Sequence, residues 1–317
     1  RAALPQRCVS NAELAASVDT SDACIVQRTG IRTRYLLGEG ETPSSLGVTA
    51  CRRALEAAGR RTEDVDLLVV ATTFPDMTCP GTSAFVAQDL GLEGTPFFDL
   101  TAGCTGFVYG LAMAGAYIAA GLGERVLVLG FEALSRVVDW SDRRTCVLFG
   151  DGAGAVLLER GSSEEGILGV SLRGDPSKAL LLHTPAGGTR RPASHATVEA
   201  REHFLRMEGS GVFRSAVPLM REAMDRALDA ASMSREEVDW IIPHQANVRI
   251  IDAFADRLGL PRERVVINVD RVANTSAASI PIALDEAVRD GRIRPGHAVV
   301  LTAFGAGVTY GAVALRM

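Results

Sequence analysis

The 317-residue sequence contains few aromatic side chains and no large excess of either charge. Aromatic residues make up 5% of the chain, and 33 basic against 38 acidic residues give a net charge of −5. A nucleic-acid-binding protein is expected to carry a basic face, so this balance argues against that class. No uninterrupted apolar run reaches the roughly 18–20 residues that a membrane span needs. The first residues also lack the basic head, apolar middle and cleavage site of a signal peptide. We therefore expect no nucleic-acid partner, no membrane partner and a cytoplasmic location.

Cysteine pairs are absent as well. The six cysteines form no CxxC motif, and none follows Cys146. Their spacing does not fit a zinc site, so we expect no metal ligand among them. Scattered cysteines in a long chain without an export signal are typical of reduced thiols. Most should be small buried apolar residues.

Apolar, β-branched segments alternate with helical ones, which is typical of an α/β fold. The chain is long enough for two units of ordinary domain size and a large core. The pattern predicts strands at residues 66–73, 96–100, 125–132, 154–161, 238–246, 265–269 and 297–307. It predicts helices at residues 51–59, 105–121, 217–231 and 247–259. The segment 105–121 is apolar around its whole circumference, so we expect a buried helix there.

Two stretches of the chain repeat one order of elements. RRTEDVDLLVV (60–70) and MSREEVDWII (233–242) each follow a helix and lead into a strand. This similarity suggests two duplicated halves, residues 1–165 and 166–317, with the boundary near residues 161–166. The loop 184–197 is long enough to be a candidate cover for a pocket.

Cys104 stands between an expected strand and the apolar helix, in PFFDLTAGCTGFVYG. A thiol at the beginning of a buried helix meets the positive end of the helix dipole, which favours thiolate. Gly103 and Gly106 permit a tight turn and a close approach of substrate. A buried structural cysteine is the alternative interpretation of the same position.

His244 and Asn274 are the other candidate site residues. His244 follows an apolar strand in IIPHQAN, where Pro243 stiffens the turn. A single histidine at a strand end is more often structural than catalytic. Asn274, in VANTSAASIPIAL, is most simply a helix cap. A cysteine, a histidine and an asparagine together, however, suit acyl transfer from a thioester followed by decarboxylative condensation.

The C-terminal segment TAFGAGVTYGAVALRM is predicted to form a glycine turn between two strands. The main-chain amides of such a turn could stabilise an oxyanion. A plain hairpin is the alternative.

The motifs TAGCTGFVYGL, FGDGAGAVLL, PHQANVRII, NTSAASIPIALDEAVRDGRIRPG, AFGAGVTYGAVALR and DTSDACIVQRTGIRTR resemble β-ketoacyl-acyl carrier protein synthase III along nearly the whole chain. The resemblance implies a thiolase-like fold, with two similar halves in a layered αβαβα arrangement, and a homodimer. It implies the condensation that initiates type II fatty-acid synthesis. In that reaction an acyl-CoA primer acylates Cys104 and then condenses with malonyl-acyl carrier protein.

The resemblance also implies roles for further residues of this sequence. Cys104 is the nucleophile, His244 and Asn274 assist decarboxylation, the amides of Cys104 and Ala306 form the oxyanion hole, and Phe304 shields the site. Arg28, Arg143 and Asn247 would bind CoA. Arg214, Arg249 and Arg257 would form a basic patch for an acidic carrier protein, because local potential governs such encounters. No metal or cofactor is implied, since the thioester supplies the activation.

The sequence departs from the family pattern at four positions. Cys24 replaces a tryptophan that stacks on adenine, so adenine binding is expected to be weaker or different. Ala306 and Ala273 replace glycines, each a one-methyl change that we expect to be tolerated. Cys79 stands where a Phe or Thr closes the acyl tunnel of the neighbouring subunit. A smaller side chain there predicts primers longer or more branched than acetyl.

Three other functions are alternatives to this condensation. A degradative thiolase needs a second cysteine near the C-terminal glycine turn, and no cysteine follows Cys146. A specialised family member could condense or transfer an unusual acyl group in a secondary-metabolite or cofactor pathway. A non-catalytic subunit that binds acyl chains or carrier protein would not need to keep all three of Cys104, His244 and Asn274.

Overall fold

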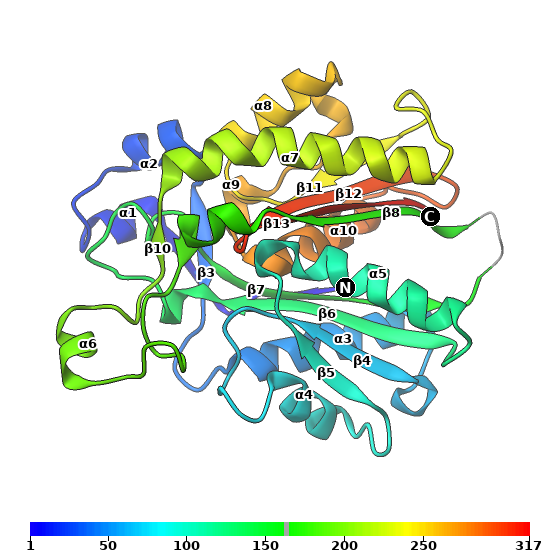
Figure 1. Ribbon diagram of the computed structural model, residues 1–317, viewed down its shortest axis with the longest axis horizontal. Helices are drawn as coiled ribbons and strands as arrows, with labels where there is room; N and C mark the ends of the chain where they lie inside the picture. The colour runs from blue at the N-terminus through cyan, green and yellow to red at the C-terminus, as the bar shows by residue number, and fades with distance from the viewer. Residues whose placement is uncertain (162–164) are drawn as a thin grey trace.

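The computed structural model describes residues 1–161 and 165–317. Two sheets lie one above the other, with helices between them and on both outer faces (Figure 1). The first sheet has the strand order β1 (Ala2–Ala3), β7 (Asp151–Glu159), β6 (Arg125–Ala133), β4 (Leu67–Ala71) and β5 (Phe97–Leu100). The second has the order β11 (Trp240–Pro243), β12 (Ala298–Gly305), β13 (Thr309–Arg316) and β8 (Gly166–Gly174). This arrangement confirms the predicted layered αβαβα fold.

Each helical layer covers a face of a sheet with apolar side chains. The central layer holds α5 (Gly106–Ala119) and α10 (Ser279–Arg289), which share one core with both sheets. The outer face of the first sheet carries α3 (Pro43–Ala58) and α4 (Thr82–Leu90). The outer face of the second carries α7 (Gly209–Ala230) and α8 (Val248–Leu258). Because the central core belongs to both sheets, the two sheets are held together by apolar burial.

Smaller elements surround one end of the sheets. Two short ribbons pair β2 (Arg7–Ser10) with β3 (Thr33–Leu36), and β9 (Leu182–His183) with β10 (Arg206–Met207). The short helices are α1 (Asn11–Ala15), α2 (Asp22–Thr29), α6 (His195–Glu199) and α9 (Val269–Val272). No helix in residues 1–161 or 165–317 combines the length and apolar character needed to cross a membrane.

The strands divide along the chain near the predicted boundary. Those of the first sheet lie within residues 2–159, and those of the second within residues 166–316. The predicted boundary near residues 161–166 includes residues 162–164, which lie outside the described residues.

The predicted strand at residues 265–269 is wrong. Only Val265 makes a bridge, to Ile241, and Val269 already begins α9. The side chain of Gln245 accounts for this, because its Oε1 accepts the main-chain N–H groups of Asn268 and Val269 at 3.0 and 3.3 Å. A side chain thus takes the place of a neighbouring strand.

Two predicted helices also differ from the structure. α7 begins at Gly209, eight residues before the predicted start at Val217, and contains Pro218 inside it. The helix tolerates this proline because apolar residues along its length pack on the second sheet. α5 is not buried all round: Phe107 is fully buried, whereas Met113 is 43% exposed.

Candidate active site

A cavity of about 630 Å³ is lined by residues from both halves of the chain. Cys104 comes from the turn between β5 and α5, whereas His244 and Asn274 come from loops that precede α8 and α10. The structure therefore brings together all three residues that were predicted to carry the chemistry. Phe304, near the end of β12, and Ala306, from the β12–β13 turn, line the same cavity.

The main chain at Cys104 packs directly against the β12–β13 turn. Gly103 has φ +57°, and a Cβ placed on it would lie 2.6 Å from the main-chain nitrogen of Ala306. A Cβ on Gly305 would lie 2.6 Å from the nitrogen of Cys104. These distances leave no room for side chains, so only glycine fits at both positions. The packing brings the N–H groups of Cys104 and Ala306 to one seam, as an oxyanion hole requires.

Burial disfavours ionisation of the Cys104 thiol. Burial raises the pKa of Cys104 to about 12, and the Ser276 hydroxyl lowers it only in part. Burial thus opposes the helix dipole, which is predicted to favour the thiolate. The thiol is only 7% exposed, and the regular helix begins two residues later, at Gly106, after a short 3₁₀ turn.

His244 is a neutral imidazole whose tautomer follows from its partner. Burial lowers the pKa of His244 to about 3. Its Nδ1 lies 2.7 Å from Oγ of Ser279, and that oxygen also accepts the main-chain N–H of Gln245 at 3.3 Å. In the part of the chain that the structure describes, Nδ1 is the acceptor available to the Ser279 hydroxyl hydrogen. We therefore assign the proton to Nε2, which makes His244 a hydrogen-bond donor.

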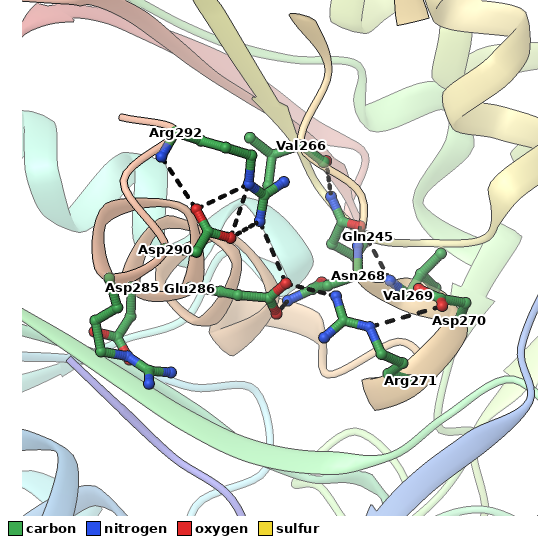
Figure 2. A network of polar contacts seen from close by, with 11 residues as sticks. Gln245, Val266, Asn268, Val269, Asp270, Arg271, Asp285, Glu286, Asp290 and Arg292 are labelled. Atoms are coloured by element: carbon green, nitrogen blue, oxygen red, sulfur yellow. Dashed lines mark hydrogen bonds and ion pairs between the residues drawn. The ribbon is translucent and has the colours of Figure 1, made fainter. Parts of the chain in front are cut away.

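A buried polar network fixes the residue next to His244 (Figure 2). Gln245 is fully buried, and its Nε2 donates to the carbonyl of Val266 at 3.0 Å. Its Oε1 accepts from Asn268, whose Nδ2 in turn donates to Glu286 at 3.3 Å. Glu286 forms ion pairs with Arg271 and Arg292. The network connects the loop that carries His244 to charged groups at the surface.

Asn274 is held at both its main chain and its side chain. Its N–H donates to Leu148 O, and its own carbonyl accepts from Gly150, both at 3.0 Å. The side-chain Oδ1 accepts the N–H of Ser276 at 2.8 Å, which leaves the Nδ2 group as a donor. The short 3₁₀ turn Ser276–Ala278 that follows has Thr275 at its N-cap, so Asn274 caps no helix, and it lines the cavity.

Sequence comparisons identify the family of this fold and site. The family model described as "3-Oxoacyl-[acyl-carrier-protein (ACP)] synthase III" matches residues 98–176, and the model of its C-terminal part matches residues 228–317. The chain is 49% identical to a β-ketoacyl-[acyl-carrier-protein] synthase III of Rhizobium meliloti, covering 99% of this chain and 97% of that protein. It is 50% identical to the protein of the same name from Erythrobacter litoralis, over 99% and 96% of the two chains. The chain belongs to the β-ketoacyl-acyl carrier protein synthase III family.

A solved structure agrees with this assignment. The 3-oxoacyl-[acyl-carrier-protein] synthase III of Aquifex aeolicus superimposes with a TM-score of 0.92 at 41% identity, covering 100% of this chain and 97% of that one. The predicted thiolase-like fold is confirmed. The protein is a condensing enzyme, an acyltransferase that initiates fatty-acid biosynthesis, as the sequence predicted.

The residues expected to bind CoA lie at the cavity of this synthase. Arg28 and Arg143 are exposed and line it together with Asn247. Arg143 pairs with Asp19 at 3.0 Å. Cys24 also lines the cavity, one helical turn before Arg28 on α2. The position expected to contact adenine is therefore at the cavity wall, but it carries a small side chain.

The predicted basic patch is only partly at the cavity. Arg214 and Arg249 line it, and the Arg249 guanidinium lies 5.8 Å from the centre of the Phe213 ring. Arg257 is exposed on α8, the helix that carries Arg249, but it does not line the cavity. Cys79 is also exposed and lies outside the lining of this chain's own cavity.

The predicted cover is wrong. No residue of the loop 184–197 lines the cavity. Leu181, Leu182 and Met207 line it instead. The loop leads away into α6, so its length reflects the small helical excursion seen in Figure 1.

Three residues of the synthase site were missed by sequence reasoning. Ser276 and Ser279 contact Asn274 and His244, respectively, and both stand in the quoted NTSAAS segment. Glu132 lies at the end of the apolar strand β6 and hydrogen-bonds Ser276. A charged residue in an otherwise apolar strand was the signal that could have identified it.

Proposed function

We propose that this protein condenses an acyl-CoA primer with malonyl-acyl carrier protein through an acyl-Cys104 intermediate. The observation that carries the proposal is the meeting of Cys104, His244 and Asn274 in one cavity. The reaction uses both thioesters as substrates and needs no metal or prosthetic group, because the thioester itself supplies the activation. Acyl-CoA substrates and six free cysteines also suit a cytoplasmic location.

In the first half-reaction the Cys104 sulfur attacks the carbonyl of the primer. The N–H groups of Cys104 and Ala306 stabilise the oxyanion of the tetrahedral intermediate. The bond from the carbonyl carbon to the CoA sulfur breaks, and the thiol proton of Cys104 ends on that sulfur. Phe304, which is 7% exposed, limits access of water to the acyl-enzyme.

In the second half-reaction malonyl-acyl carrier protein loses carbon dioxide. His244 donates from Nε2 and Asn274 from Nδ2 to the malonyl thioester carbonyl, where negative charge develops. The resulting enolate attacks the acyl carbonyl on Cys104 and releases the thiolate, which is then protonated. Because burial lowers the pKa of His244 to about 3, the imidazole acts as a neutral donor throughout.

The two substrates use different positive groups at the entrance. Arg28 and Arg143 suit the CoA phosphates, and Asn247 suits the pantetheine arm. Arg214, Arg249 and Arg257 would contact the acidic carrier protein, with Arg249 and Arg257 carried by one helix. Charged contacts of this kind steer the encounter even though the whole chain carries a net charge of −5.

A homodimer completes this proposal. β5 is an edge strand of the first sheet, and its Phe97 and Phe98 are 45% and 42% exposed. An edge with exposed aromatic residues favours pairing with a second copy. In such a dimer Cys79 would contribute to the partner's cavity, and its small side chain would admit primers longer or more branched than acetyl.

Sedimentation should give a dimer, and Phe98→Glu should give a monomer.

Intact-protein mass spectrometry with a panel of acyl-CoAs tests the proposal. Single acylation on Cys104 by short or branched primers, released by malonyl-acyl carrier protein, would support it. Strict preference for acetyl-CoA would contradict the primer prediction. Labelling by unusual acyl groups only would indicate the specialised family member. A lack of labelling would favour the non-catalytic subunit.

A further inference from the structure

Glu132 is a buried carboxyl group that the proposed reaction does not use. It is 1% exposed, near the end of β6. Oε1 accepts the N–H of Thr73 at 2.9 Å, and Oε2 accepts the N–H of Phe74 at 3.3 Å. No ion pair involves Glu132 in residues 1–161 and 165–317. A carboxyl group without a cation is costly to bury, so a purely structural role would be served as well by a neutral side chain.

Ser276 connects this carboxyl group to the catalytic cavity. Its Oγ donates to Oε1 of Glu132 at 3.2 Å, across 144 positions of sequence. Its main-chain N–H donates to Oδ1 of Asn274 at 2.8 Å. Ser276 has φ +49°, a conformation that a serine rarely adopts, so its contacts must hold it there. The carboxylate of Glu132 is one of these contacts.

The nucleophile belongs to the same cluster. The Ser276 hydroxyl lowers the pKa of Cys104, whereas the charge of Glu132 raises it. Burial raises the pKa of Glu132 to about 7. Cys104 is the titratable group whose pKa the charge of Glu132 shifts. The hydrogen-bond partners of Glu132 are the main-chain N–H groups of Thr73 and Phe74 and the hydroxyls of Thr72 and Ser276.

We propose that Glu132 is a positioning residue of the condensing site, which acts through Ser276 on both Asn274 and Cys104. The hydrogen bond to Ser276 orients the Asn274 amide, and the charge on the carboxyl group sets how readily the thiol ionises. This inference rests on the proposed roles of Cys104 and Asn274.

The two effects can be separated by two substitutions. Glu132→Gln keeps the size and an oxygen acceptor for Ser276 but removes the charge. Glu132→Ala removes both. Asp151→Asn is a matched control, because Asp151 is a fully buried carboxyl group of the neighbouring strand β7 whose partners are Ser135 and Leu37.

The first measurement is the rate of Cys104 alkylation by iodoacetamide against pH, followed on the Cys104 peptide by mass spectrometry. In the unmodified protein, Glu132 ionises as the pH rises through about 7 and then disfavours the thiolate beside it. The rate should therefore rise less steeply across about pH 7, where Glu132 ionises, than well below or well above that pH. In Glu132→Gln the rate should keep rising about tenfold per pH unit, as for an uncoupled thiol. Asp151→Asn should behave like the unmodified protein.

The second measurement is decarboxylation of malonyl-acyl carrier protein. Glu132→Ala should lower its rate on the order of a hundredfold, as expected for a displaced catalytic group, with the KM for acyl-CoA unchanged. Glu132→Gln should restore most of this loss. Identical alkylation profiles for the unmodified protein and Glu132→Gln would overturn the proposal, and this assay needs only the folded protein. If the unmodified protein accepts no acyl-CoA at all, the proposed function fails, while the alkylation result still decides the position of Glu132.

Discussion

Ala273 holds the main chain just before Asn274 in a conformation that few residues other than glycine adopt. Its φ and ψ are +58° and −164°. The sequence predicted that alanine in place of glycine is tolerated here, and that prediction considered only the space for one methyl group. The backbone conformation itself costs about 1–3 kcal/mol for a residue with a Cβ. The strain lies next to a residue that must point into the cavity.

We predict that Ala273→Gly stabilises the protein by about 1 kcal/mol, because glycine adopts this conformation without strain. Thermal or urea unfolding would measure the gain. Ala57→Gly, on an exposed part of α3, is the matched control and should lower stability by about 0.5–1 kcal/mol. A loss of stability in Ala273→Gly would show that the position is not strained.

Ser279 fixes the tautomer of His244, and its removal should separate the two half-reactions. We predict that Ser279→Ala lowers decarboxylation of malonyl-acyl carrier protein about 10–100-fold, the usual range for a lost partner of this kind. Acylation of Cys104 by acyl-CoA should be unchanged, because His244 acts only in the second half-reaction. Rapid-quench acylation and carbon dioxide release would measure the two steps.

Ser171→Ala is the control for this prediction. Ser171 is a buried serine of β8 whose hydroxyl has no hydrogen-bond partner in the described residues. It should leave both half-reactions unchanged. Equal loss of acylation and decarboxylation in Ser279→Ala would instead indicate a general distortion of the site.

At the scale of elements, the β12–β13 turn and the turn before α5 form one unit. Gly305 has a negative φ, so an alanine there meets no backbone penalty and only the steric one. Its Cβ would lie 2.6 Å from the nitrogen of Cys104. One methyl group would therefore push apart the two N–H groups that we propose as the oxyanion hole.

We predict that Gly305→Ala slows acylation of Cys104 by about 10²–10³-fold, the range for loss of an oxyanion donor. Single-turnover acylation with a saturating primer would measure it. Gly188→Ala is the control, since a Cβ there meets no atom within 4 Å. Unchanged acylation in Gly305→Ala would exclude the seam as the oxyanion hole.

The sequence predicted most elements because their patterns are local. The strands β4, β6 and β7 and the helix α8 are each evident from periodicity and flanking glycines. The strand expected at residues 265–269 failed because Gln245, about twenty positions earlier, takes the main-chain donors that a strand would use.

The difference between local patterns and distant contacts also explains which site residues the sequence predicted and which it did not. Cys104, His244 and Asn274 are recognisable because each belongs to a short motif. Ser276 and Glu132 act through contacts with residues far away in sequence, and no local pattern shows such a pairing. Burial, which the sequence does not give, raises the pKa of Cys104 and so opposes the predicted effect of the helix dipole.

On the scale of the whole molecule, the entrance of the cavity carries arginine side chains although the chain as a whole has a negative net charge. Arg249 is exposed at the cavity and is not part of any ion pair within the described residues. A rim charge of this kind affects encounter and salt dependence more than chemistry.

We predict that Arg249→Glu raises the KM for the carrier protein on the order of tenfold, or about 1.4 kcal/mol, because it reverses a charge that faces an acidic partner. The KM for acyl-CoA should change much less. Steady-state kinetics at low and high salt would show both effects. Arg190→Glu, in the loop that does not line the cavity, is the control. An unchanged carrier-protein KM would remove Arg249 from the docking surface.

The seam between Gly103 and Ala306 also affects how the protein comes to be active. Cys104 belongs to the half of the chain that forms the first sheet. The second N–H group of the proposed oxyanion hole is that of Ala306, directly after β12 and about two hundred positions later. While only the first half is in place, the proposed oxyanion hole lacks the N–H group of Ala306. Attack of Cys104 on acyl-CoA is therefore slow until the last strands have docked. The acylation activity thus appears only once folding is complete.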